Sequence, residues 1–204
     1  MQDINEEAKK QFTNSDIAAI KATKMQIRDK ILTVFKPFSA QGKILIDMNK
    51  FYVTGGCIGS LIRNEKPKDY DVYCRDQFFF MKLKSLLEND PLFSDMVEET
   101  EESYRDVKAG GKLFTENAIT LKGDVQLICK HFGEPKEVRD TFDFVHCTPY
   151  YEIGNDKLYI SPLQIQLIKE KQLMINNKDN VTLHRISKFL DRGYKSTPEI
   201  VNYY

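Results

Sequence analysis

The 204-residue chain has no long apolar run, no closely spaced cysteine pair and no excess of charge of either sign. No apolar run approaches the roughly 20 residues that a membrane-spanning helix needs. The N-terminal sequence MQDINEEAKK is too acidic and polar for a signal peptide. These absences predict a cytoplasmic protein without a membrane partner.

The balance of charges limits the kind of nucleic-acid contact that the chain can make. Lys plus Arg and Asp plus Glu number 30 each, so the formal net charge is zero. Proteins that hold long nucleic acids through many phosphates are usually basic. If RNA is a substrate, we therefore expect the contact to be local.

The cysteines have the wrong spacing for a zinc site. None is in a CxxC pair, and all lie in apolar or strand-like segments. This pattern predicts buried free thiols rather than zinc ligands or disulfides. The four residues are Cys57, Cys74, Cys129 and Cys147.

The most informative stretch is residues 51–74, FYVTGGCIGSLIRNEKPKDYDVYC. Its first part, FYVT, is aromatic and β-branched and predicts a strand that stops at Gly55 and Gly56. Ile58, Leu61 and Ile62 then recur at helical spacing. A strand, a glycine turn and a helix start together predict a phosphate site, because the backbone can approach a ligand closely there.

Twelve residues separate Gly56 from an acidic pair. Asp69 and Asp71 alternate with Tyr70 and Val72, which predicts a strand with both carboxylates on one face. Two neighbouring carboxylates repel each other unless a cation lies between them. Mg²⁺ suits this position, because it prefers oxygen ligands and binds one or two carboxylates together with substrate phosphates.

The joint pattern of strand, glycine pair, helix and DxD strand resembles the nucleotidyltransferase superfamily. This superfamily includes DNA polymerase beta, the poly(A) polymerase head and the CCA-adding enzymes, and the last two are the closest in pattern. The resemblance implies that Gly55 and Gly56 contact the triphosphate. It also implies that Asp69 and Asp71 hold two Mg²⁺ ions, for which Mn²⁺ is an alternative.

One departure separates the chain from the tRNA-repair branch. CCA-adding enzymes continue after the glycine pair with x-x-R-D, whereas Gly59 and Ser60 stand at the last two positions here. The resemblance is therefore to the superfamily, in a minimal form of the kind expected in bacteriophages or bacteria.

The superfamily also carries a third carboxylate on a later strand, between apolar residues. Asp143 fits this setting within residues 141–151, which we expect to form a strand. Such a carboxylate would complete the metal site or take up the proton of the attacking hydroxyl. Asp124 is the rival candidate, although a turn at residues 122–124 explains it without a metal.

Several cations and polar residues are candidates for nucleotide binding. Ser60 lies in the helix after the glycine turn. Arg63 and Lys68 lie between that turn and the acidic pair, and for these two cations a solvated loop is the alternative interpretation. Arg185 and Arg192 lie on the basic side of a C-terminal helix that is loosely similar to the nucleotide-contacting helix of poly(A) polymerases. The alternative there is the solvated face of a packing helix.

Other polar residues of the same region have simpler explanations. Asn117, Thr120 and Gln126 can face the cleft, but ordinary polarity of an exposed strand face is the favoured interpretation. His131 and His146 are interpreted as packing or surface residues, because Mg²⁺ does not prefer imidazole.

We expect an α+β nucleotidyltransferase fold with a short mixed sheet, helices packed on one side and a C-terminal helical appendage. The head would span residues 1–155 and the appendage residues 156–204. Within the head we expect a helix over residues 14–36 that ends before Pro37, a helix over 77–90 and a hairpin over 117–130. An insertion would occupy residues 90–112.

The expected activity is Mg²⁺-dependent transfer of NMP from an NTP to a hydroxyl, with release of pyrophosphate. An RNA 3′ end, such as that of tRNA, is the preferred acceptor, and a protein or a small molecule is the alternative. A non-catalytic nucleotide-binding module of antitoxin type is the competing class. A phosphohydrolase is disfavoured because its metal sites usually add histidine ligands.

Overall fold

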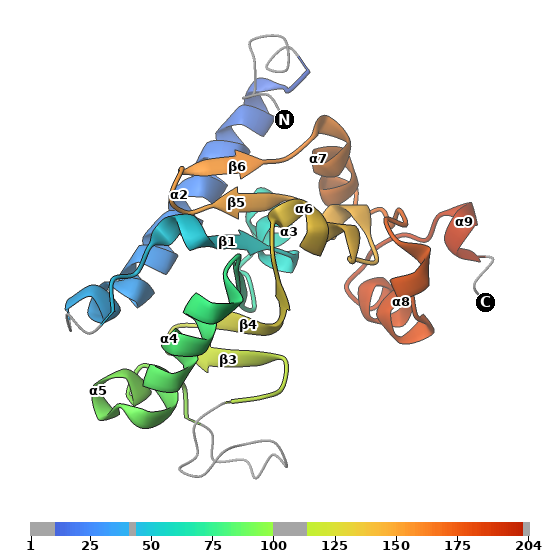
Figure 1. Ribbon diagram of the computed structural model, residues 1–204. Coiled ribbons are helices and arrows are strands. Elements are labelled where there is room, and N and C mark those ends of the chain that lie inside the picture. The colour runs from blue at the N-terminus through green and yellow to red at the C-terminus, as the bar shows by residue number, and fades with distance from the viewer. Residues whose placement is uncertain (1–10, 41–43, 100–113, 202–204) are drawn as a thin grey trace.

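The computed structural model describes residues 11–40, 44–99 and 114–201 as a mixed sheet with surrounding helices (Figure 1). The six strands lie in the order β3-β4-β2-β1-β5-β6, and neighbours are antiparallel except β2 and β4, which are parallel. This confirms the expected α+β class. The strands are β1 (Phe51–Thr54), β2 (Tyr70–Cys74), β3 (Ala118–Leu121), β4 (Val125–Phe132), β5 (Tyr150–Glu152) and β6 (Lys157–Tyr159).

The helices follow the predicted apolar patterns with small shifts at their ends. The helices predicted after the glycine pair and from residue 77 are confirmed, as is the hairpin of β3 and β4. The helices are α2 (Asn14–Ala40), α3 (Gly56–Ile62), α4 (Gln77–Asn89), α5 (Pro91–Ser94), α6 (Pro135–Asp140), α7 (Pro162–Lys169), α8 (Leu183–Leu190) and α9 (Pro198–Val201). None in the described part is long and apolar enough to cross a membrane.

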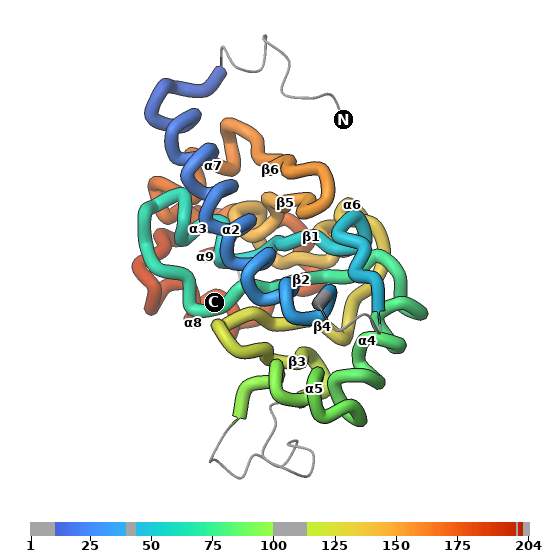
Figure 2. Tube along the Cα trace, turned by 90° about the vertical axis from the view of Figure 1, so that its left-hand side faces the viewer, coloured from blue at the N-terminus to red at the C-terminus, as the bar shows by residue number. Residues whose placement is uncertain are grey.

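Helix α2 corrects the prediction that Pro37 ends the first helix. The helix continues through Pro37 to Ala40 and runs along one face of the sheet (Figure 2). A proline inside a helix costs about 3 kcal/mol. The side chains of Phe35 and Phe38 are fully buried, and the Phe38 ring also packs against Phe93. Burial of an aromatic ring contributes about 1.5–3 kcal/mol, which offsets much of that cost.

The two faces of the sheet are covered differently. Helices α2, α3 and α4 pack with alternate strand residues in the main core, as expected for helices on one side. On the other face a smaller cluster joins Tyr52, Tyr73 and Tyr150 to Val138 of α6. This second face is open beside β2 and β4, where a cavity lies.

The sheet extends past residue 155, where we expected the head to end. That position lies within the β5–β6 hairpin, and Ile165 and Ile168 of α7 still belong to the main core. A separate cluster forms from Phe144, Leu173, Ile186, Phe189 and other residues. Most members of this cluster follow α7, and Phe144 and Cys147 join it from the segment after α6.

The strand predicted over residues 141–151 is wrong for its first part. Asp143 lies in a loop before a 3-10 helix at Val145–Cys147, and only Tyr150–Glu152 joins the sheet. The physical reason is a different set of backbone partners. The side-chain amides of Asn176, Asn177 and Asn180 donate to the carbonyls of residues 139–142, which the sheet would otherwise have to satisfy.

The cysteine prediction is confirmed, with one residue only partly buried. All four thiols are free, three are buried and Cys129 is half-buried. The expected insertion is only partly covered, because residues 100–113 lie outside the described residues.

Candidate active site

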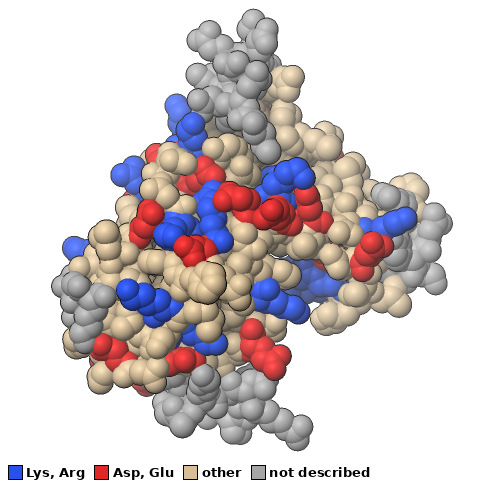
Figure 3. All heavy atoms as spheres, in the orientation of Figure 1, with Lys and Arg blue, Asp and Glu red and all other residues tan. Residues whose placement is uncertain are grey.

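A cavity of about 770 Å³ lies between the open face of the sheet and the C-terminal helices. Figure 3 shows Lys and Arg side chains gathered in the recess between these two parts. Except for Arg63, every residue that the sequence placed at the site lines this cavity. These residues are Gly55, Gly56, Ser60, Lys68, Asp69, Asp71, Asp143, Arg185 and Arg192.

The glycine turn lies directly against the acidic pair. Gly55 has φ of +95°, and a Cβ built on it would lie 3.2 Å from Oδ2 of Asp71. Its N–H donates to the carbonyl oxygen of Cys147 at 3.2 Å, so this donor is already engaged. A Cβ on Gly56 would meet no protein atom within 4 Å. Gly55 is thus required by the fold, whereas the space beside Gly56 is open.

The carboxylates of Asp69 and Asp71 face the cavity without a protein partner. No side chain of the described residues forms a hydrogen bond or ion pair with either of them. Burial, and then the charge of Asp69, raise the pKa of Asp71 to about 7. The charges of Lys188 and Arg185 act in the opposite direction on the pKa of Asp71, although neither cation forms an ion pair with it. Two oxygen donors on one face without an ion-paired cation suit Mg²⁺, so the residues present fit the expected ion.

Asp143 has a partner of a different kind. Its Oδ2 accepts from Nε of Arg185 at 2.5 Å, and its Oδ1 accepts from Nη2 at 3.2 Å. Oδ1 also accepts from the backbone N–H of Phe144 at 3.0 Å. Arg185 and Phe144 therefore engage both oxygens of this buried carboxylate. Among the described residues, no three His, Cys, Asp or Glu side chains are grouped to hold a metal ion.

The rival carboxylate, Asp124, lies outside the cavity. It occupies the β3–β4 turn with φ of +62°, and its backbone carbonyl accepts from the N–H of Tyr70 at 2.8 Å. The turn therefore accounts for Asp124 without a metal.

Several residues just before β3 and on β4 line the cavity, although we did not expect them at the site. Asn117, Gln126, Lys130 and His131 all contribute to the wall. Gln126 lies beside Asp71 in the parallel β2–β4 register. The signal that could have identified it is the apolar–polar–apolar run at residues 125–127, the setting that was sought for the third carboxylate.

The opposite wall is basic. Arg185 and Lys188 of α8, together with Arg192 in the turn that follows, line the cavity across from the acidic pair. Burial, and then the charges of Arg185 and Arg192, lower the pKa of Lys188. A bound polyanion would relieve this repulsion between cations.

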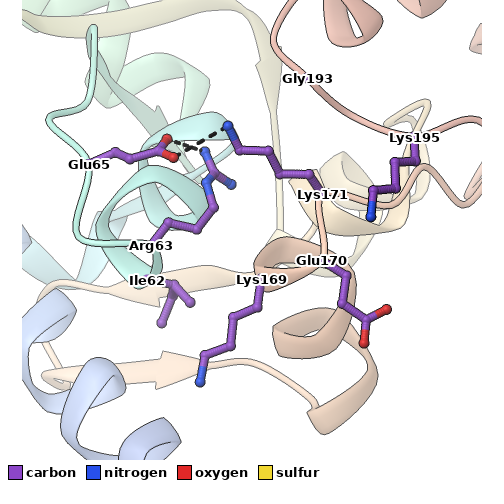
Figure 4. Close-up of a pocket in the computed structure, with 8 residues that line it drawn as sticks. All are labelled: Ile62, Arg63, Glu65, Lys169, Glu170, Lys171, Gly193 and Lys195. Atoms are coloured by element: carbon purple, nitrogen blue, oxygen red, sulfur yellow. Dashed lines mark hydrogen bonds and ion pairs between the residues drawn. The ribbon is translucent and has the colours of Figure 1, made fainter.

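Arg63 lies at a second pocket of about 520 Å³ (Figure 4). Its Nη1 donates to the hydroxyl of Tyr194 at 3.0 Å, and its Nη2 donates to Glu65 at 2.7 Å. Lys171 pairs with the same Glu65 at 3.4 Å, as the dashed lines in Figure 4 mark. Arg63 thus joins α3 to the C-terminal part and does not line the cavity that holds the acidic pair.

The family model described as Gabija anti-defense 2 family protein matches residues 25–171, which is more than half of the 204 residues. The chain belongs to the Gabija anti-defense 2 family. The matched range of this family includes the glycine turn, the acidic pair and Asp143, but ends before α8. No curated protein matches the sequence.

Among solved structures, CCA-adding enzymes resemble this Gabija anti-defense 2 family member. The Thermotoga maritima enzyme complexed with tRNA is 15% identical, with a TM-score of 0.50 over 76% of this chain and 39% of its own. A CCA-adding enzyme in apo form I is 13% identical, with a TM-score of 0.53 over 99% of this chain and 44% of its own. A CCA-adding enzyme in complex with ATP is 13% identical, with a TM-score of 0.51 over 98% of this chain and 43% of its own.

These similarities show the nucleotidyltransferase fold. The chain spans less than half the length of each of these three enzymes.

Proposed function

We propose that this protein is a Mg²⁺-dependent nucleotidyltransferase that moves NMP from an NTP to a hydroxyl acceptor. The observation that carries the proposal is the pair Asp69 and Asp71, which faces the cavity without a protein partner and lies against the glycine turn. A partnerless carboxylate pair is unfavourable in a chain that has no chemistry to perform, because like charges repel and burial disfavours ionisation.

The two walls of the cavity have different roles in binding. Gly56, without a Cβ, leaves room for the triphosphate beside α3, and Ser60 and Lys68 also line the cavity. Across the cavity Arg185 and Arg192 bind the nucleotide, and Asp143 orients Arg185 through both of its oxygens. Asp69 and Asp71 hold the divalent ions, which are Mg²⁺ or Mn²⁺.

The reaction is an in-line displacement at the α-phosphorus. The acceptor oxygen forms a bond to the α-phosphorus, the bond to the bridging oxygen of the β-phosphate breaks, and pyrophosphate leaves. The proton of the acceptor hydroxyl passes to water. When bound, Mg²⁺ stabilises the phosphate charge and acidifies the attacking hydroxyl. The remaining rate acceleration comes from positioning of the substrates by the two walls and from the positive charge of the basic wall.

An RNA 3′ end, including that of tRNA, is the first candidate acceptor. The fold similarity to CCA-adding enzymes supports this choice. The name of the family, which refers to anti-defense against Gabija, favours a second candidate, a hydroxyl group on a protein of that system. A non-catalytic nucleotide-binding module remains the competing class.

The test incubates the protein with each α-³²P-labelled NTP, Mg²⁺, total cellular RNA and purified Gabija proteins. Label is then resolved in RNA, protein and small-molecule fractions. We expect label in one fraction from the wild type and none from Asp69→Ala. The control is Asp191→Ala, which removes an exposed carboxylate outside the cavity lining and should leave transfer unchanged. Equal transfer by Asp69→Ala and the wild type would overturn the proposal.

A further inference from the structure

The sheet position beside the acidic pair carries an amide instead of a carboxylate. Asp71 pairs with Gln126 in the parallel β2–β4 register, and both line the cavity. Neighbouring strands lie about 4.8 Å apart, so the two side chains are adjacent on the same face. An amide offers one neutral oxygen, whereas a carboxylate offers two charged ones.

No other described carboxylate takes the place of Gln126. Asp143 lines the cavity, but Arg185 and the N–H of Phe144 engage its oxygens. Thr120, which pairs with Gln126 on β3, is also neutral. The metal-binding part of the sheet therefore supplies two carboxylates, both from β2 and the residue before it.

Two ions need different numbers of protein ligands in such a site. The ion next to the triphosphate gains phosphate oxygens in addition to the carboxylates, so two carboxylates suffice for it. The ion next to the acceptor has no phosphate of the leaving group to replace a missing carboxylate. Whether an ion occupies the acceptor-side position then depends on the ligand that β4 provides.

We infer that Gln126 leaves the acceptor-side metal position incomplete, so that the NTP-bound protein holds one divalent ion tightly and recruits the second with the acceptor. This inference rests on the proposed function. It makes Gln126 a determinant of when the site becomes competent: a nucleotide loaded in the absence of acceptor lacks the second ion and is protected from wasteful hydrolysis.

The test counts bound Mn²⁺ by electron paramagnetic resonance in the presence of an α,β-methylene NTP, which cannot react. The variants are Gln126→Glu and, as the matched control, Thr120→Glu, which adds the same charge one strand farther from Asp71. We expect one tightly bound ion per chain in the wild type and in Thr120→Glu. Gln126→Glu should bind a second ion with affinity increased on the order of tenfold.

The outcomes separate this inference from the proposed function. Two tightly bound ions in the wild type would overturn the inference, even if Gln126→Glu fails to fold. A count that stays at one in a folded Gln126→Glu variant would overturn it as well. Absence of nucleotide-dependent Mn²⁺ binding, or binding that survives in Asp69→Ala, would instead remove the proposed function.

Discussion

At the scale of single residues, Gly55 is the most constrained position of the site. Its φ of 95° and ψ of −156° lie in a region that only glycine adopts readily, and a Cβ would press on the Asp71 carboxylate. We predict that Gly55→Ala lowers the free energy of unfolding by about 1–3 kcal/mol. Urea denaturation followed by circular dichroism measures this change.

The Gly56→Ala substitution tests the effect of the glycine turn on ligand binding without an effect on the fold. Because an added Cβ meets no protein atom within 4 Å, the unfolding free energy should stay the same or rise by up to about 1 kcal/mol. NTP affinity should fall, since the methyl group occupies space beside the glycine turn. Equilibrium dialysis with labelled NTP measures the affinity. A Gly56→Ala protein that binds NTP as the wild type does would show that the triphosphate lies elsewhere.

His146 makes the protein sensitive to acid. It is buried among Phe189, Tyr194 and other aromatic rings, and burial followed by the charges of nearby arginines lowers its pKa to about 3. Because the unfolded histidine takes up a proton near pH 6.5, stability is complete above that pH and falls as the pH drops toward 3.

We predict that this histidine lowers the free energy of unfolding by about 2 kcal/mol when the pH falls from 7 to 5. His146→Phe should remove that part of the loss, because its ring has no nitrogen to protonate and the unpartnered Nδ1 disappears. Urea denaturation at both pH values provides the measurement. The same pH dependence in His146→Phe and in the wild type would contradict this account.

At the scale of elements, the Asp143–Arg185 pair fixes α8 beside the loop after α6. We predict that Asp143→Asn lowers the unfolding free energy by about 1–3 kcal/mol, less than for a fully buried pair because Arg185 is 36% exposed. NTP affinity should fall with it, because Arg185 loses its orientation.

Metal affinity distinguishes this positioning role from metal binding by Asp143. Mn²⁺ titration of Asp143→Asn should give the wild-type affinity, whereas Asp69→Ala loses it. A fall of tenfold or more in Mn²⁺ affinity in Asp143→Asn would show instead that Asp143 is a metal ligand.

Elements that depend on local patterns could be predicted from the sequence. Alternation placed β2, and the turn at residues 122–124 placed the hairpin, because both signals lie within a few residues of the structure they specify. The prediction that the first helix ends before Pro37 was wrong because Phe93, which is distant in sequence, and the sheet stabilise Phe38 in the part of the helix beyond the proline. The loop around Asp143 was missed because its backbone partners are asparagines more than 30 residues away.

The residues of the site also divide into those with a local sequence signal and those whose position depends on contacts distant in sequence. Asp69 and Asp71 were predictable because a two-residue period on one strand fixes their common face. Gln126 was not singled out because its place beside Asp71 depends on the pairing of strands about 55 residues apart in sequence. Arg63 was assigned to the nucleotide because its contact with Tyr194, far along the chain, has no local signal.

At the scale of the whole molecule, the cavity lies between two parts of the protein that have different hydrophobic cores. The main core supports the glycine turn and the acidic pair, and the C-terminal cluster supports the basic wall. A ligand that contacts both walls should therefore stabilise both parts together. Mg²⁺ and an NTP at 100 times Kd should raise Tm by about 5–10 °C.

Differential scanning calorimetry tests this stabilisation. Asp69→Ala should show little or none of it, because the ion no longer bridges protein and triphosphate. A Tm that does not change for the wild type would indicate that the cavity is not an NTP site.

The most direct test of nucleotidyl transfer identifies the bond that breaks. The protein is incubated with Mg²⁺, the acceptor fraction and an NTP labelled at both the α- and γ-phosphates, with Asp69→Ala beside it. We predict equal amounts of α-label on the acceptor and γ-label in pyrophosphate, both absent with Asp69→Ala. Release of γ-label as orthophosphate, with no α-label on any acceptor, would contradict nucleotidyl transfer and identify the protein as a phosphohydrolase.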